Sequence, residues 1–431
     1  MGLVLPERLV TCIAWNSDGS NMAVGLQCGF AIYSTELLLR NDGRLLEVLY
    51  VPVVGGVGCI ALHGQSNLVA VSGWSHDHRT AVELYDLTVR EVEGDPEARS
   101  VIARAVVPGR VNALCFHPLL VMVGLESGYI YAFDHALENI QIYKTSQRTG
   151  AANCAVGKMA LATMLDREMA GGIVHSLLRG VILGPTTGTV RCLRYVSGRC
   201  VELESSHSFL KDVKEENSGP LEEVVVELHK SMVYAITITA EGRCAVTVSE
   251  RGTMLKLLDV KRGVVMAQFS RGTTPNTVLT VALYQSFSDT IVACISDSGT
   301  LHVFQCSAFD NEARSAEVGG GTSDARQLSI VQRWADYRSS VSSKIRFAIP
   351  EDGLCDSCLG SRDGGSTVYN AVIKPHDSSA TTIFVVQRCA TGDGVSAKAR
   401  LLSIKVYLSS TDASEEGTSA LRSFYFPKNE V

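Results

Sequence analysis

One short stretch of the chain combines a guanidinium, a glycine and hydroxyl groups: Phe269-Ser270-Arg271-Gly272-Thr273. It ends a strand-like run, and the surrounding segment 229–273 carries seven lysines and arginines against three acids. Phosphate groups are bound best by cationic donors in fixed geometry, with hydroxyl and backbone N–H groups donating to the remaining oxygens. The stretch therefore predicts a local site for a phosphorylated ligand.

The composition limits the class of protein that can contain such a site. The formal net charge is -6, so the chain lacks the broad basic excess of a nucleic-acid-binding protein. Hydrophobic residues make up 46% and charged residues 19%, which is typical of a folded globular protein. The thirteen cysteines favour buried, reduced thiols, and the first residues lack the pattern of a secretion signal. We expect a cytoplasmic protein that does not bind nucleic acid.

A repeated unit runs through the chain and must position the site. Each copy has a short apolar strand, a polar turn ending in glycine, and a second strand that alternates apolar and polar residues. The turn glycines at 128, 188, 252 and 299 are 60, 64 and 47 residues apart, which suits four-stranded propeller blades with loops. With a further copy at 22–33 and two less regular copies, at 68–86 and 367–406, the pattern predicts a single all-β domain, a seven-bladed β-propeller of the WD-repeat type.

The boundaries follow from the same pattern. We place the propeller at 1–410 and a C-terminal tail at 411–431. Two insertions interrupt the propeller, an acidic loop at 202–223, expected on the outer rim, and a longer stretch at 307–343. We expect the ring to close by Val10–Trp15 joining the C-terminal strands, because closure leaves few sheet edges exposed.

The repeats and the basic segment resemble the PROPPINs, a family of seven-bladed propellers that bind phosphoinositides in autophagy and endosomal traffic. The strongest match runs from Leu228-His229-Lys230-Ser231 through Phe269-Ser270-Arg271-Gly272 to His302-Val303-Phe304, in the expected blades five and six. The family signature is Phe-Arg-Arg-Gly, and Ser270 stands where its first arginine would be. The two arginines serve separate headgroup pockets in the family, as expected because adjacent strand residues point to opposite faces.

The resemblance assigns residues to both pockets. The pocket that keeps its arginine would use Arg271, Gly272, Ser296, Thr300 and His302. The weakened pocket would use His229, Thr247, Ser249, Thr253 and Lys256, with Ser270 in place of the arginine. Loss of one charge-assisted contact removes about 1.5–3 kcal/mol, roughly a 10- to 150-fold loss of affinity. Any one of these histidines and hydroxyls could instead serve structure alone, by tying adjacent strands together.

The stretch 327–338 has the residue spacing of a short amphipathic helix with arginines on its flanks. Its apolar side would present Leu328, Ile330, Val331, Trp334 and Tyr337. Tryptophan and tyrosine favour the headgroup depth of a membrane, and arginine complements anionic lipid. The resemblance implies that this loop of blade six inserts into the bilayer, although a helix packed on the propeller itself fits the same pattern.

The sequence carries no pattern of a catalytic or metal site. We find no nucleophile elbow, P-loop or paired acid arrangement, so we expect a protein that is not an enzyme and needs no cofactor. Cys355-Asp356-Ser357-Cys358 and His76-Asp77-His78 lack partner ligands in the sequence, so neither predicts a metal site.

The resemblance implies a set of binding partners. The lipid would be phosphatidylinositol 3-phosphate, with phosphatidylinositol 3,5-bisphosphate as a second candidate. The protein would be recruited from the cytoplasm to autophagosomal precursor, endosomal or vacuolar membranes, and would bring autophagy or endosomal machinery there, including a large autophagy lipid-transfer protein. The alternative is a WD-type propeller scaffold for protein assembly with little or no lipid binding.

Overall fold

A computed structural model gives the structure of much of the chain. The residues that it describes are 9–16, 19–36, 47–63, 66–75, 78–88, 101–117, 119–145, 159–166, 175–196, 222–286, 289–307, 341–342, 345–349, 366–375, 380–390, 398–407 and 420–425.

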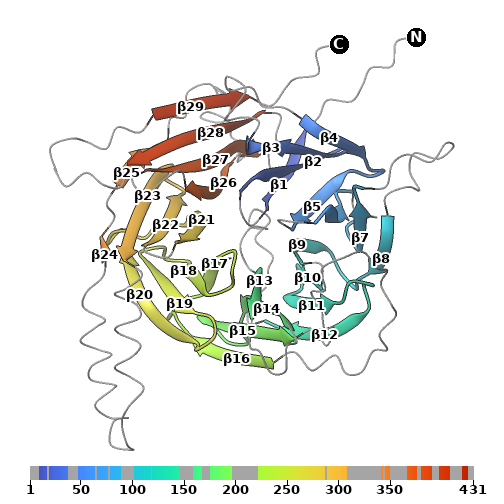
Figure 1. Cartoon of the computed structure of the whole chain (residues 1–431), viewed down its shortest axis with the longest axis horizontal. Coiled ribbons are helices and arrows are strands. Elements are labelled where there is room, and N and C mark those ends of the chain that lie inside the picture. Colours follow the sequence, from blue (N-terminus) through green and yellow to red (C-terminus); the bar gives the residue numbers. More distant parts are fainter. Residues whose placement is uncertain are drawn as a thin grey trace, which may run out of the picture.

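The strands form seven sheets arranged as a ring (Figure 1). Blade one contains β1 (Val10–Trp15), β2 (Asn21–Leu26), β3 (Gly29–Ser34) and β4 (Glu47–Pro52). Blade two contains β5 (Val57–Leu62), β6 (Leu68–Gly73), β7 (Ala81–Asp86) and β8 (Val101–Val106). Blade three contains β9 (Val111–His117), β10 (Leu120–Leu125), β11 (Tyr129–Phe133) and β12 (Asn139–Lys144). Blade four contains β13 (Met159–Asp166), β14 (His175–Leu183), β15 (Thr189–Val196) and β16 (Glu222–Glu227).

Among the remaining blades, blade five gains a fifth strand from later in the sequence. Blade five contains β17 (Val233–Ile238), β18 (Cys244–Ser249), β19 (Met254–Asp259), β20 (Val264–Ser270) and also β24 (Val341–Ser342). Blade six contains β21 (Val278–Gln285), β22 (Asp289–Ser296), β23 (Thr300–Ser307) and β25 (Ile345–Ala348). Blade seven contains β26 (Ser366–Pro375), β27 (Ala380–Ala390), β28 (Lys398–Tyr407) and β29 (Ala420–Tyr425). The predicted all-β, seven-bladed propeller is confirmed.

The apolar core lies between neighbouring blades. One cluster joins Val82 and Leu84 of blade two to Val121 and Val123 of blade three. Another joins blade five to blade six and includes Phe269. Alternation along each strand explains this arrangement, because every second side chain points to the same face of the sheet. Each blade therefore buries its faces against its two neighbours.

The ring closes in a different way from the prediction. β1 pairs with β2 inside blade one, and β29 supplies the outer strand of blade seven. The predicted joining of Val10–Trp15 to the C-terminal strands is therefore wrong, because blade seven already has its four strands. For the same reason the propeller extends beyond residue 410, into the range predicted as a tail. Side-chain packing joins the two blades instead, with the rings of Trp15 and Phe384 stacked at a centroid distance of 6.2 Å.

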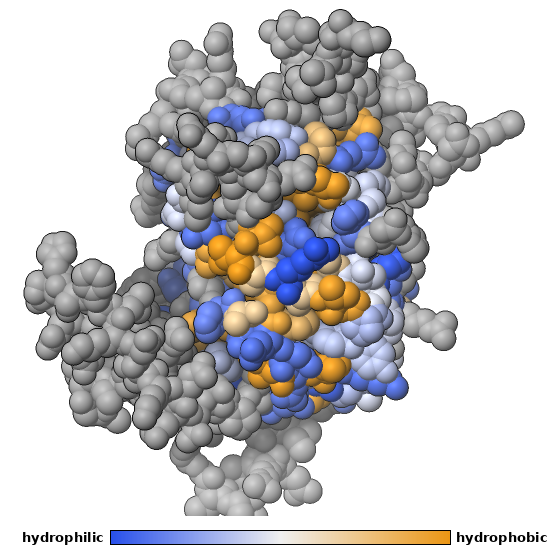
Figure 2. Space-filling model, turned by 90° about the vertical axis from the view of Figure 1, so that its right-hand side faces the viewer, coloured by the Kyte–Doolittle hydropathy of each residue, from blue (hydrophilic) through white to orange (hydrophobic). Residues whose placement is uncertain are grey.

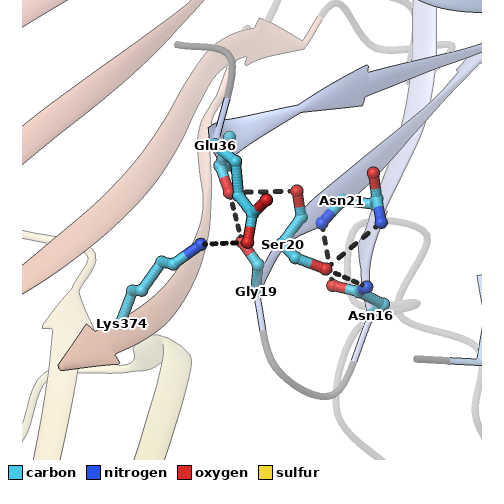
Figure 3. Close-up of polar contacts among 7 residues, drawn as sticks. Asn16, Gly19, Ser20, Asn21, Glu36 and Lys374 are labelled. Carbon is cyan, nitrogen blue, oxygen red and sulfur yellow. Dashed lines mark hydrogen bonds and ion pairs between the residues drawn. The ribbon is translucent and has the colours of Figure 1, made fainter. Parts of the chain in front are cut away.

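Polar contacts add to this junction between blades one and seven (Figure 3). Lys374 on β26 places its Nζ atom 3.8 Å from Oε1 of Glu36, which follows β3. The turn after β1 is fixed by Asn16, whose Nδ2 donates to Ser20 Oγ at 2.8 Å and whose Oδ1 accepts from the Asn21 N–H at 3.0 Å. Side-chain packing and this ion pair therefore join the two blades, without a shared strand.

The structure also corrects the ends of both predicted insertions. Glu222 and Glu223, assigned to the acidic loop, begin β16, and Glu223 Oε2 lies 3.3 Å from Nε of Arg191. The end of the longer insertion forms β24, which pairs with β20. The residues expected to enter a membrane lie outside the described residues: Leu328, Ile330, Val331, Trp334 and Tyr337.

Candidate functional site

The residue that follows the outer strand occupies an equivalent position in six blades, and we call this position the blade joint. Its backbone N–H donates to the carbonyl of the residue just before the third strand, with N···O distances of 2.8–3.1 Å. From blade one to blade six the joint residues are Val53, Val107, Thr145, Leu228, Arg271 and Ile349. The apolar members pack into the clusters between blades, so the joint is part of the core.

Arg271 is the one charged residue among these six joints of the described chain. It is as buried as its apolar counterparts, with 5% of its surface exposed, against 3% for Val107 and Leu228. A buried guanidinium costs several kcal/mol of folding free energy unless its donors are satisfied. Residues that break a local structural rule in this way occur mostly at functional sites. The burial of Arg271 therefore identifies a candidate site.

Two backbone carbonyls hold the Arg271 guanidinium. Nε donates to the Gly252 oxygen and Nη2 donates to the Thr274 oxygen, both at 2.6 Å. Gly252 has φ of +61°, and a side chain there would collide with the backbone of Asn276. A guanidinium has five N–H donors, so these two bonds fix its plane and three donors lie outside them. Arg271 forms no ion pair with a carboxylate of the described residues.

Open space lies beside Gly272, the residue that follows Arg271. Apart from its two chain neighbours, no atom comes within 4 Å of the place where a Cβ would stand on Gly272. A glycine with free space beside it lets a ligand approach the backbone closely. Arg271 therefore offers a charge in fixed geometry, and Gly272 offers space beside its own backbone.

A row of hydroxyl groups lies at the turn between β22 and β23. Ser296 Oγ and Ser298 Oγ are 2.8 Å apart, and Ser298 Oγ donates to Thr300 Oγ1 at 3.4 Å. The sequence prediction included Ser296 and Thr300 but missed Ser298. The alternation of hydroxyl residues over 296–300 is visible in the sequence and could have identified it.

Cys294 lies on the strand that leads to this hydroxyl row, and its pKa is affected by the charge of Arg271. On β22 it faces His302 of β23, and both residues are buried. Burial raises the pKa of the Cys294 thiol to about 12, and the positive charge of Arg271 opposes part of that rise. The charge of Arg271 therefore reaches Cys294 on β22, the strand that ends at Ser296.

The other predicted pocket forms a hydrogen-bonded group in blade five. His229 Nε2 lies 2.9 Å from Thr247 Oγ1, and Thr247 faces Lys256 across the strand pair. Lys256 donates its Nζ proton to the Leu228 carbonyl. Burial, together with the charge of Lys256, lowers the pKa of His229 to about 4, although a hydrogen bond with the backbone of Thr247 acts in the other direction. His229 is therefore neutral at pH 7 and can offer a hydrogen bond, but no charge.

Ser270 lies at the edge of that group. It ends β20 and faces Met254, while Thr253 precedes β19 and Ser249 ends β18. Because consecutive strand residues point to opposite faces, Ser270 and Arg271 serve different sides of the sheet. This geometry is what two separate pockets require, and the Ser270 side lacks the second guanidinium.

A different part of the ring exposes aliphatic side chains (Figure 2). On the outer strand of blade two, Ile102 and Val106 are 52% and 73% exposed. On the outer strand of blade three, Ile140 and Ile142 are 37% and 47% exposed. Figure 2 shows apolar patches alternating with polar residues on this side of the molecule. Exposed aliphatic residues on edge strands favour contact with another chain.

The described residues include no helix that is long and apolar enough to span a membrane. They also include no group of three or more histidine, cysteine or acidic residues that could hold a metal ion. His76, Asp77, Cys355 and Cys358 lie outside the described residues.

Several known proteins are similar to the chain in sequence, while no family model matches it. Autophagy-related protein 18 of Debaryomyces hansenii is 22% identical over 305 residues, which cover 69% of this chain and 51% of that protein. The protein of the same name from Komagataella pastoris is 25% identical and is covered to 50%. The chain thus spans about half the length of these relatives. SVP1-like protein 2 of Pichia angusta is 23% identical, with 84% of this chain and 88% of that protein covered.

Solved structures share the fold over nearly the whole chain. Kluyveromyces lactis Hsv2 matches with a TM-score of 0.55 and 16% identity, covering 98% of this chain and 99% of that one. A complex of KlAtg21 with the coiled-coil of AgAtg16 matches with a TM-score of 0.56 and 12% identity, covering 97% of this chain and 100% of that one. The seven blades and these autophagy-related relatives support the resemblance to the PROPPIN family of β-propellers.

Proposed function

We propose that the protein binds a phosphoinositide headgroup at Arg271, between blades five and six, and that it is not an enzyme. The observation that carries this proposal is a buried guanidinium at a blade joint where four of the five other described joints place an apolar side chain and one places a threonine. Its two carbonyl bonds hold the guanidinium plane, and the open space at the neighbouring Gly272 lets a ligand approach the backbone. Phosphate oxygens are the acceptors that such a fork of N–H groups suits best.

The hydroxyl row supplies the complementary donors. Ser296, Ser298 and Thr300 carry rotatable O–H groups, which can bond to the phosphate oxygens that a guanidinium does not reach. The ligand we propose is phosphatidylinositol 3-phosphate, with the 3,5-bisphosphate as the second candidate. The pocket beside Ser270 is the weaker of the two, because Lys256 is half-buried and His229 is neutral.

Flotation with liposomes tests this proposal. Vesicles of phosphatidylcholine with and without phosphatidylinositol 3-phosphate are mixed with the full chain, and the floating fraction is measured. We expect wild type to float with the phosphoinositide vesicles alone, and Arg271→Ala to lose most of that binding. Thr274→Ala is the matched control, because its contact with Arg271 uses a backbone oxygen that the substitution keeps. Equal flotation of wild type and Arg271→Ala would contradict the assignment.

Membrane recruitment would serve the assembly of autophagy or endosomal machinery. We place the protein in the cytoplasm and on autophagosomal precursor, endosomal or vacuolar membranes, with a large autophagy lipid-transfer protein among its partners. A solved relative forms a complex with a coiled coil. The exposed aliphatic residues of β8 and β12 are the surface that favours protein docking here. A propeller scaffold without lipid binding is the second candidate, and failure of all phosphoinositide vesicles to float wild type would favour it.

A further inference from the structure

β24 makes blade five unlike the other described blades. It has two residues and pairs in parallel with the outer edge of β20, so that Val341 faces Phe269 and Ser342 faces Ser270. Each of the other six sheets has four strands in the part of the chain that the structure describes. The added pairing stops one residue before Arg271.

Arg271 therefore follows a strand whose end is paired on both edges. On the inner edge, Ser270 faces Met254, and the Arg271 N–H donates to the Thr253 carbonyl at 3.0 Å. On the outer edge, β24 supplies the second set of backbone partners. Pairing on both edges restricts the φ and ψ angles of the strand end more than pairing on one edge. The restriction matters here because the 2.6 Å bonds of the guanidinium require a fixed backbone.

The same short segment also reaches the blade six side of the site. Two residues separate β24 from β25, which pairs with β23, where Ala348 faces Thr300 and Arg346 faces His302. β24 and β25 are thus paired through their backbones with strand residues of both predicted pockets. A segment in this place can set the spacing between the Arg271 guanidinium and the donors of blade six.

We infer that β24 is a strap that positions Arg271, so that affinity for a phosphorylated headgroup depends on the pairing of β24 with β20. The identity of the ligand in this inference rests on the proposed function. The restraint that β24 places on β20 does not depend on it. β24 acts through the backbone of β20 and does not touch the ligand. Because coupling between two binding events is reciprocal, a bound headgroup strengthens the docking of β24 by the same factor.

The test compares two double variants of the full chain. Val341→Pro/Ser342→Pro removes both backbone N–H groups of β24, and Val341→Ala/Ser342→Ala keeps them. The probe is soluble inositol 1,3-bisphosphate, measured by titration calorimetry, so membrane insertion plays no part. We expect the proline variant to bind at least about 5-fold more weakly than wild type and the alanine variant to stay within about 2-fold. Equal affinities of the two variants would overturn the strap.

Amide hydrogen exchange gives a readout that does not need the ligand. We expect the amides of 269–272 to exchange at least about 10-fold faster in the proline variant than in the alanine variant. Exchange in β9 to β12 is expected to stay the same in both variants. Faster exchange spread over every blade, or no change at 269–272, would contradict a local strap. If wild type fails to bind the probe, the proposed function fails, and the exchange data alone decide on the strap.

Discussion

The joints of blades two and five share a backbone hydrogen bond and differ in the side chain that they carry. Val107 donates its N–H to the Thr80 carbonyl, and Arg271 donates its N–H to the Thr253 carbonyl. Val107 completes the apolar cluster between blades two and three, whereas Arg271 brings a charge to the equivalent place between blades five and six. The comparison teaches that a joint can form without a charged side chain. We therefore expect the guanidinium to lower the stability of its joint and to serve a separate purpose.

Arg271→Leu tests that conclusion most strongly, because leucine is the residue at the joint of blade four. We expect binding to phosphatidylinositol 3-phosphate liposomes to fall by about 100-fold or more, since at least one bidentate charged contact is lost. The free energy of unfolding should stay equal or rise, because a buried charge is replaced by an apolar side chain. Flotation and urea unfolding measure the two effects. A variant that unfolds while wild type is stable would show that Arg271 is structural.

Val107→Arg is the reverse change. In blade two the Arg79 carbonyl, which corresponds to that of Gly252, already accepts from the Val111 N–H at 2.9 Å, so we expect a loss of about 3 kcal/mol in the free energy of unfolding. No headgroup affinity should appear. Urea unfolding measures the loss, with Val107→Ala as the control for lost packing. A Val107→Arg variant as stable as wild type would remove the contrast between the two joints.

Two buried histidines, in blades three and five, give a pH dependence. Burial and the neighbouring His63 lower the pKa of His117 to about 3, and burial with Lys256 lowers that of His229 to about 4. Below about pH 6.5 these histidines bind protons in the unfolded chain but stay neutral in the folded chain. The free energy of unfolding therefore falls as pH is lowered from about 6.5 towards 4. We expect a loss of about 2 kcal/mol per histidine in urea unfolding. His229→Gln should reduce this slope, and an unchanged slope would contradict its buried, neutral state.

Ser270→Arg tests whether the pocket beside His229 and Thr247 can still bind a headgroup. The added guanidinium would restore a charge-assisted contact, so we expect about a 10-fold gain in affinity for phosphatidylinositol 3-phosphate liposomes. Ser270→Gln, of similar length but neutral, is the control. Unchanged affinity in the arginine variant would count against a headgroup pocket beside His229 and Thr247.

The sequence predicted the parts of the fold that local patterns encode. Strands such as Leu68–Gly73 and Ala81–Asp86 lie where alternation and turn glycines placed them. It failed for β29, because the interval 408–419 between that strand and β28 is much longer than a hairpin loop. It could not predict β24 either, since two residues in parallel pairing leave no periodic pattern.

The sequence likewise predicted some features of the candidate site and missed others. Arg271 and the hydroxyl residues were predicted from their types and from the family resemblance, and they remain the proposed ligand contacts. The blade joint could not be predicted, because it depends on the equivalence of Val53, Val107, Leu228 and Ile349 in three dimensions. Ser298 was missed although its spacing from Ser296 is regular.

The junction between blades one and seven has a consequence for the order of the chain. Since no strand crosses from one blade into the sheet of the other, every blade from one to four is encoded by an uninterrupted piece of sequence. A circular permutant that starts at β5 and carries β1 to β4 after β29 would contain the same seven sheets. Neither Glu36 nor Lys374 would lose its partner in such a rearrangement, because their contact does not depend on where synthesis begins.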